Sequence, residues 1–109
     1  MSPVSEHVER NGMFDFEWDQ AKAATNLRKH KVDFELAATV ILDRLAKSVL
    51  DEDHGAFEER WITMGHARNG RLLVVSHTWS ETADGRISVR LISARPANRN
   101  ERRQYESEE

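Results

Sequence analysis

Two strand-length runs in the C-terminal half constrain the fold most. Residues 71–79 (RLLVVSHTW) and 86–95 (RISVRLISAR) are rich in β-branched and aromatic residues, and the segment between them ends in Asp84-Gly85, a pair typical of hairpin turns. In the first run, Leu72 to Val75 are apolar without interruption, so this strand has two apolar faces and needs cover on both. We therefore predict a β-hairpin in the middle of a sheet.

The second run has two chemically different faces. Strand side chains alternate, which places Ile87, Val89 and Leu91 on one face and Arg86, Ser88 and Arg90 on the other. The first face should pack in the core, and the second should carry guanidinium groups.

The N-terminal half predicts a strand and two helices. Alternating apolar and acidic residues over 14–18 favour a short strand at the edge of the sheet. Asp19 caps a helix over 20–30, and Asp33 caps a second helix that ends near Leu42. The apolar positions expected to be buried are Ala23, Ala24 and Leu27 in the first helix and Phe34, Ala37, Ala38 and Ile41 in the second.

The remaining elements follow in order. Residues 46–51 and 60–67 predict two strands joined by an acidic loop around Asp53-His54-Gly55, and residues 68–70 (RNG) predict a turn into the central strand. Asn98 and Glu101 form a capping box for a last helix that runs through about Tyr105. The order β-α-α-β-β-β-β-α predicts an α+β fold, with an antiparallel sheet, two N-terminal helices on one face and a short C-terminal helix at its end.

Length and composition limit the class of protein. With 109 residues the chain supports one domain, which we place at 13–106, between a mobile leader over 1–12 and an acidic tail over 107–109. Cysteine is absent, so thiolate metal sites and cysteine nucleophiles are excluded. Because no run is long enough to be a signal or a membrane span, we expect a cytoplasmic protein without membrane contact.

Charge is distributed unevenly along the chain. The formal net charge is −3, but the segment 86–103 holds six arginines and one acid, a local charge of about +5. An indiscriminate polyanion binder is therefore disfavoured, whereas a local site for phosphate groups is favoured. The arginines are Arg86, Arg90, Arg95, Arg99, Arg102 and Arg103.

Several short motifs together resemble the BrnT-type toxins of bacterial toxin–antitoxin systems. The pieces are Phe16-Glu-Trp-Asp19, Lys22, Asn26-Leu-Arg-Lys-His30, Val32-Asp-Phe34, Arg60, Gly65, Gly70-Arg-Leu-Leu-Val-Val75, Ile92-Ser-Ala-Arg-Pro-Ala97, Glu101, Arg102 and Tyr105. The resemblance covers most of the chain. Two departures are Lys31, where the family usually has glycine, and the additional leader over 1–12.

The resemblance implies a RelE-like fold and a metal-independent endoribonuclease. It also implies a cognate BrnA-type antitoxin with a ribbon-helix-helix region, which would contact DNA and link this chain to DNA only indirectly. No cofactor is expected. RNA supplies its own nucleophile, the 2′-hydroxyl, so the enzyme needs proton-transfer groups and cations for the phosphorane.

Arginine and histidine suit these tasks, because arginine holds two phosphate oxygens and histidine exchanges protons near neutral pH. The catalytic candidates are His30, Arg60, His77, Arg90 and Arg95. The RNA-binding candidates are Lys22, Lys29, Arg71, Arg99, Arg102 and Tyr105.

Other interpretations stay open at this point. His77 lies among valines and can be a core residue, His30 can serve only as a favourable charge at a helix end, and the three tryptophans can be core residues or stack on bases. The histidine spacing disfavours a metal site. An alternative function is a non-catalytic module that binds an antitoxin-like partner and acts with it as a transcriptional co-repressor; a stand-alone DNA-binding module fits less well, because no recognition helix follows a turn.

Overall fold

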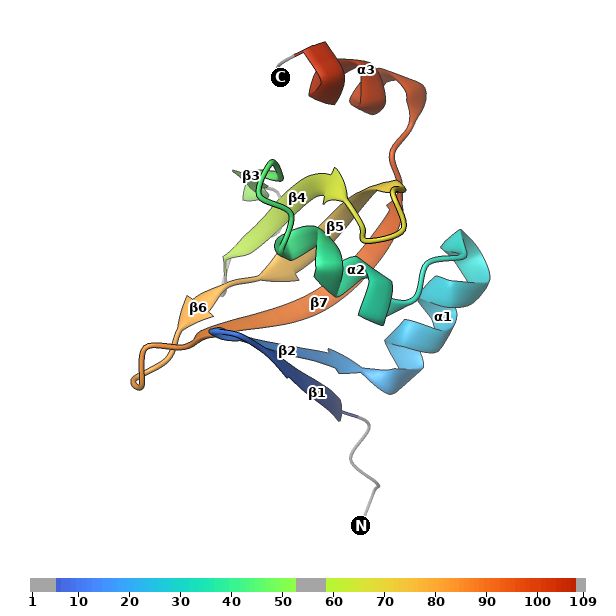
Figure 1. The fold of residues 1–109 in the computed structure, drawn as a ribbon. Coiled ribbons are helices and arrows are strands. Elements are labelled where there is room, and N and C mark those ends of the chain that lie inside the picture. Colours follow the sequence, from blue (N-terminus) through green and yellow to red (C-terminus); the bar gives the residue numbers. More distant parts are fainter. Residues whose placement is uncertain (1–5, 53–58, 108–109) are drawn as a thin grey trace.

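The computed structural model describes residues 6–52 and 59–107, which form one mixed sheet of seven strands and three helices (Figure 1). The strands are β1 (Glu6–Asn11), β2 (Phe14–Asp19), β3 (Lys47–Leu50), β4 (Arg60–His66), β5 (Leu72–Thr78), β6 (Ser80–Glu81) and β7 (Ile87–Pro96). The helices are α1 (Gln20–His30), α2 (Phe34–Ile41) and α3 (Arg99–Ser107). The α+β class and the predicted order of elements are confirmed. The predicted acidic loop around Asp53 lies outside the described residues.

The sheet has the order β1-β2-β7-β5-β4-β3, and β6 pairs with β7 off this path. The two runs expected at the centre are β5 and β7, which pair antiparallel in the middle. Leu72 to Val75 are buried, as expected of a strand with cover on both faces, and Gly85 has the positive φ of 84° that the predicted turn requires. The central hairpin is therefore confirmed.

Two details of the sheet differ from the sequence-based expectation. The leader expected over 1–12 contains a strand, because β1 pairs antiparallel with β2 through a turn at Gly12. As a result, β2 is an inner strand and not an edge strand. It also pairs parallel with β7, so the sheet is not wholly antiparallel. These two strands are far apart in the sequence, so no hairpin constrains their relative direction.

The helices begin where capping residues were predicted. The side chain of Asp19 accepts hydrogen bonds from the backbone of α1, and Asp33 does the same for α2. The buried stripe of α2 is confirmed at Phe34, Ala37 and Ala38, which are 0–4% exposed.

The buried face of α1 was predicted correctly only at Ala23, which packs against the core. Leu27 is 48% exposed and Ala24 is exposed, whereas the buried residue of this helix is the polar Asn26. The physical reason is that α1 packs beside the edge of β7 and presents a hydrogen-bonding side chain to it, so its buried side need not be apolar.

The main core lies between α2 and one face of the sheet. Its members include Phe16, Trp18, Phe34, Leu73 and Val89. The other face of the sheet, which we call the open face, is defined by strand alternation from these core residues. It carries Arg60, Ile62 and Met64 of β4, Val74 and Ser76 of β5, and Arg90, Ser93 and Arg95 of β7.

Helix α3 lies at one end of the sheet, where it begins with the predicted capping box. The backbone N–H of Asn98 donates to Glu101 over 2.9 Å, and the N–H of Glu101 donates to the Asn98 side chain over 2.8 Å. The helix is anchored by Tyr105, which is 1% exposed and donates from its hydroxyl to the backbone oxygen of Leu45. Among the described residues, no helix is long and apolar enough to cross a membrane.

Candidate functional site: a basic pocket beside the open face

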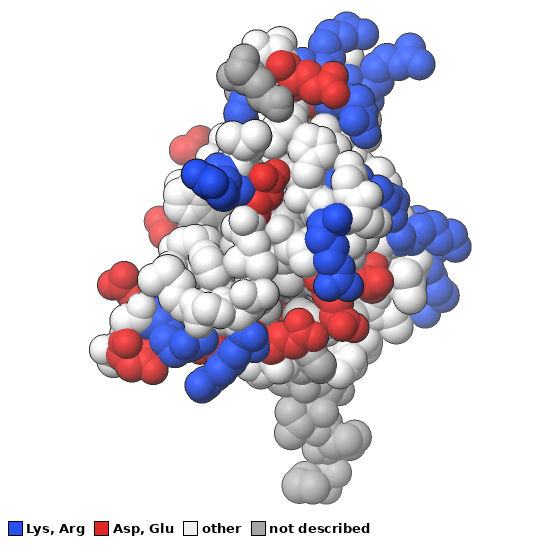
Figure 2. Space-filling model, in the orientation of Figure 1, with Lys and Arg blue, Asp and Glu red and all other residues white. Residues whose placement is uncertain are grey.

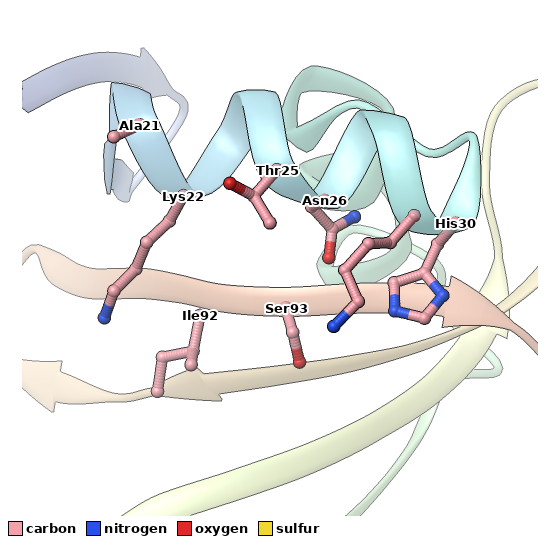
Figure 3. A pocket seen from close by; sticks show the side chains of 8 residues that line it. Ala21, Lys22, Thr25, Asn26, His30, Ile92 and Ser93 are labelled. Atoms are coloured by element: carbon pink, nitrogen blue, oxygen red, sulfur yellow. The ribbon is translucent and has the colours of Figure 1, made fainter.

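A pocket of about 300 Å³ lies between α1 and β7 (Figure 3). Its walls combine basic and hydroxyl side chains from the helix with two residues of the strand. The lining residues are Ala21, Lys22, Thr25, Asn26, Lys29 and His30 of α1 and Ile92 and Ser93 of β7. Ser93 belongs to the open face, so the pocket opens onto the side of the sheet that α2 leaves uncovered.

Asn26 explains why α1 lies where it does. Its side-chain amide donates to the backbone oxygen of Ala94 over 2.8 Å, and its side-chain oxygen accepts from the Ala94 N–H over 3.0 Å. The amide also donates to the backbone oxygen of Val32. Asn26 therefore satisfies the edge of β7 beyond the last residue that pairs with β2, where a neighbouring strand would otherwise supply the hydrogen bonds.

A bulge in β7 shapes the strand side of the pocket. Ser76 pairs with Ser93 but His77 pairs with Leu91, so Ile92 is an extra residue in β7. Bulges re-aim side chains and recur next to active sites. Here Leu91 and Ala94 both remain in the core, while Ile92 and Ser93 both line the pocket.

The end of α1 holds His30 at the pocket. Lys31 follows with a left-handed φ of 60°, and its N–H donates to the backbone oxygen of Leu27 over 3.0 Å. The guanidinium of Arg71 donates to the Lys31 oxygen over 3.1 Å and caps the helix. Lysine at the usual glycine position therefore leaves the helix end intact, and Arg71 contributes to this cap.

The pocket is electrically unbalanced. Within the part of the chain that the structure describes, the side chains of Lys22, Lys29 and His30 make no hydrogen bond or ion pair. Figure 2 shows Lys and Arg side chains along the side where α1 lies and at the α3 end. Two uncompensated ammonium groups and an imidazole that line one pocket are suited to bind phosphate groups.

The arginines of β7 share the open face with the pocket but have acidic partners. Arg90 lies 3.6 Å from Glu17 on the neighbouring strand. Arg95 forms a two-bond pair with Glu101 of α3, with distances of 2.8 and 2.9 Å. This pairing with Arg95 lowers the pKa of Glu101 from 4.5 to about 2. Arg95 thus joins β7 to α3.

Arg60 occupies the open face on β4, opposite Thr78. The Thr78 hydroxyl accepts the backbone N–H of Arg90 over 3.2 Å, so Arg60 and Arg90 flank one residue of β5. The Nε of Arg60 is buried and has no hydrogen-bond partner among the described residues. Three catalytic candidates, Arg60, Arg90 and Arg95, therefore lie on the open face, onto which the pocket lined by His30 opens.

His77 lies on the opposite, core side of the sheet and is 1% exposed. Its Nδ1 lies 2.9 Å from the backbone oxygen of Thr78, so Nδ1 carries the proton and donates. Its Nε2 then accepts from the Thr63 hydroxyl over 2.6 Å, and Thr63 contacts Ser48 over 2.6 Å. Burial lowers the pKa of His77, against the opposing effect of the Thr78 bond. The structure therefore places His77 in the core and away from the pocket.

The RNA-binding candidates of α3 lie apart from this pocket. Arg99 and Arg102 are exposed, and Arg102 lies 3.8 Å from Glu106. Tyr105 is buried against the ring of His66, so its ring is not open to a base. Of the tryptophans, Trp18 is buried, Trp61 is half-buried and Trp79 is 42% exposed.

Sequence reasoning missed the hydroxyl and amide members of the pocket, namely Thr25, Asn26 and Ser93. Asn26 could have been found, because a polar residue on the inner side of a helix needs buried hydrogen-bond partners. Ser93 could not, because its position depends on the bulge. In the described residues no group of three or more His, Asp or Glu side chains is arranged to hold a metal ion.

The fold and the pocket define a small α+β protein with a basic recess beside an open sheet face. Residues 18–101 match the family model described as ribonuclease toxin, BrnT, of type II toxin-antitoxin system, and the chain belongs to this family. The description of this family, a ribonuclease toxin of a toxin–antitoxin system, implies an RNA substrate and an antitoxin partner.

A solved structure supports the fold. The chain is similar to the Brucella abortus ribonuclease toxin, BrnT, with a TM-score of 0.55 and 23% sequence identity, over 75% of this chain and 94% of that one. At this identity the likeness concerns the fold alone. A comparison with curated proteins found no match.

Proposed function

We propose that this chain is a metal-independent endoribonuclease toxin whose catalytic pocket is the recess between α1 and β7. The observation that carries the proposal is that Lys22, Lys29 and His30 line one pocket with Ser93. None of the three helix side chains is engaged by another described residue. They are therefore available to a phosphodiester.

The chemistry needs one proton-transfer group and positive charge. His30 takes the proton from the RNA 2′-hydroxyl, whose oxygen attacks the adjacent phosphorus. The bond from phosphorus to the 5′ oxygen breaks, and this oxygen takes a proton from solvent because the pocket is open. The products are a 2′,3′-cyclic phosphate and a 5′-hydroxyl end.

Lys22 and Lys29 would stabilise the charge that grows on the phosphorane oxygens, where fixed cations contribute most. Arg60 and Arg90 on the open face would hold neighbouring phosphates of the same strand, because the face continues from the pocket across β7 and β5. Arg90 would exchange its 3.6 Å contact with Glu17 for a phosphate oxygen. The guanidinium of Arg95 is already bound to Glu101, so Arg95 would contribute by fixing α3 against β7 and would not hold a phosphate itself.

The physiological partner would be an antitoxin of the BrnA type with a ribbon-helix-helix region. That region would bind DNA and would make this chain part of a repressor complex without a DNA contact of its own. The family description names a type II toxin–antitoxin system, which supports an antitoxin as the partner of this chain.

The test is to incubate the purified chain with RNA in excess EDTA and to analyse the ends produced. We expect cleavage to persist, with cyclic phosphate and 5′-hydroxyl ends, and to fall by about 10²-fold or more in His30→Ala. Loss of cleavage in EDTA that one divalent ion restores would contradict the mechanism. Absence of cleavage by the wild-type chain under all conditions would favour the non-catalytic co-repressor.

A further inference from the structure

A second pocket lies on the core side of the sheet, at the end where β4 begins and β5 ends. It has a volume of about 170 Å³ and is lined by Ser48 of β3, Trp61 of β4, His77 of β5 and Trp79, which follows β5. Strand alternation places these side chains on the sheet face opposite the open face. None of the described residues that line the basic pocket lines this one. We call it the tryptophan pocket.

The two tryptophans give this pocket aromatic walls. Trp61 and Trp79 are diagonal neighbours across β4 and β5, because Trp61 pairs with His77 and Trp79 lies two residues further on. The ring of Trp79 is held by an edge contact with the ring of Phe14, with the ring centroids 5.6 Å apart. Trp61 is half-buried and Trp79 is 42% exposed, so both indoles keep surface that a ligand can reach.

A chain of hydrogen bonds ends at this pocket and has only one possible direction. The backbone oxygen of Thr78 can only accept, so His77 donates to it from Nδ1 over 2.9 Å. Burial lowers the pKa of His77, so at neutral pH the ring is uncharged and its Nε2 carries no proton. Thr63 therefore donates to Nε2 over 2.6 Å, and Ser48 donates to the Thr63 hydroxyl over 2.6 Å.

The direction of this chain leaves Ser48 as an acceptor. Its only proton is used by the bond to Thr63, and its lone pairs receive no hydrogen bond within residues 6–52 and 59–107. A hydroxyl in this state favours a ligand that donates a hydrogen bond over one that only accepts. The amino groups of adenine, cytosine and guanine are such donors.

The size and charge of the pocket restrict the ligand further. Pockets for drug-sized molecules have roughly 300–1,000 Å³, so a volume of about 170 Å³ suits a single planar ring system. No charged side chain of a described residue lines the pocket, so a phosphate or carboxylate is not stabilised here. Aromatic side chains stack on the flat faces of bases. A neutral base with an amino group meets all of these conditions.

We propose that the tryptophan pocket binds a single nucleobase that carries an exocyclic amino group. The base stacks on the indoles of Trp61 and Trp79, and its amino group donates to the Ser48 hydroxyl. The base belongs either to a free nucleotide or to an RNA strand, and its assignment to the RNA that this chain cleaves rests on the proposed function. The pocket contributes affinity and takes no part in the cleavage step, because it lies on the sheet face opposite the open face.

The first test compares adenosine with purine riboside, two uncharged ligands that differ only in the amino group. Each is titrated into the isotopically labelled chain while NMR follows the indole N–H signals of Trp61 and Trp79. We expect both signals to move, and purine riboside to bind about fivefold more weakly because it cannot donate to Ser48. Ser48→Ala should bind adenosine as weakly as purine riboside, with unchanged affinity for purine riboside. Ser76→Ala, on the opposite face of β5, is the matched control and should keep the fivefold difference.

A second pair of variants tests the stacking. Trp79→Ala should weaken the binding of both nucleosides about fivefold or more. Trp79→Phe should retain most of the affinity, because it keeps an aromatic ring beside Phe14, and it separates the loss of stacking from a loss of folding.

The source of the base is found by titrating RNA that carries a 2′-deoxy sugar at the cleaved position. Weaker binding of this RNA by Ser48→Ala assigns the base to the RNA strand, and unchanged binding assigns it to a free nucleotide. A wild-type chain that fails to cleave RNA would contradict the proposed function and would leave the nucleoside titrations in force.

Three results would overturn the proposal. The first is the absence of any change at Trp61 and Trp79 when adenosine is added. The second is equal affinity of the wild-type chain for adenosine and purine riboside, which would remove Ser48 as the selecting group. The third is movement of the two indole signals with tetramethylammonium and not with nucleosides, which would assign the tryptophans to a cage for a cation.

Discussion

Asn26 and Ala94 exchange two hydrogen bonds, of 2.8 and 3.0 Å, that continue the sheet past its paired strand. The exchange joins a helix side chain to a strand backbone 68 residues away. Because Lys22, Lys29 and His30 share the helix with Asn26, this contact also sets their distance from β7.

Asn26→Ala should therefore destabilise the protein. It would leave the buried N–H and oxygen of Ala94 without partners, at a cost of about 3 kcal/mol in the free energy of unfolding. Urea denaturation measures the effect. Thr25→Ala, an exposed neighbour on α1, is the control and should change stability by about 0.5 kcal/mol or less. A loss below about 1 kcal/mol in Asn26→Ala would show that water satisfies these groups.

The left-handed residue at the end of α1 offers a gain in stability. Lys31 has a φ of 60°, where a side chain is strained and glycine is not. Lys31→Gly should raise the free energy of unfolding by about 0.5–1 kcal/mol after the added entropy of the unfolded chain is deducted. Lys29→Gly, inside the same helix, should instead lower it by about 1 kcal/mol. Equal losses in both variants would contradict the helix end described here.

The ionisation of Glu101 should make the free energy of unfolding depend on pH. Its pKa in the folded protein is about 2 and its ordinary value is 4.5, because Arg95 stabilises the carboxylate. A lowered pKa means that the stabilisation is present above pH 4.5 and is lost as the pH falls toward 2. Urea midpoints at pH 5 and pH 2.5 should therefore differ less in Glu101→Gln than in the wild type. Glu106→Gln is the control, and a pH dependence equal to that of the wild type in Glu101→Gln would contradict the assignment.

Substitutions of the two candidate histidines, His30 and His77, should have different effects on stability and on cleavage. His77→Ala removes a buried ring that satisfies Thr63 and Thr78, so it should cost about 2–4 kcal/mol in unfolding free energy while the folded protein keeps its cleavage rate. His30→Ala should keep the melting temperature within a few degrees and lose the rate. Thermal melts and single-turnover cleavage below the melting range measure both. The reverse pattern would move catalysis to the core side of the sheet.

The sequence predicted local structure better than the relations between distant segments. Caps at Asp19, Asp33 and Asn98, and the turn at Gly85, depend on side chains within a few residues, and all formed as expected. The parallel pairing of β2 with β7 does not depend on any local signal. The strand β1 was not predicted because its sequence has a single valine, Val8, among charged and polar residues. Such a composition is typical of a mobile leader.

In the candidate site, too, local features were predicted better than contacts between distant segments. Residue chemistry indicated arginine, lysine and histidine, but not which of them would be neutralised by acids. Glu17 and Glu101 reach Arg90 and Arg95 only because of the register of β2 and the position of α3. By contrast, the positive charges of Lys22 and Lys29 on α1 are not neutralised within the described residues, because no Asp or Glu lines their pocket.

The proposed function depends above all on RNA binding in the recess between α1 and β7. The most direct measurement is the change in backbone amide NMR shifts on titration with a short RNA that carries a 2′-deoxy sugar at the cleaved position, which allows binding without reaction. We expect the largest changes at residues 22–30 and at Ile92 and Ser93, with smaller ones along the open face at Arg60 and Arg90. Changes confined to α3 or to the strands β1 and β6, with none in α1, would contradict it.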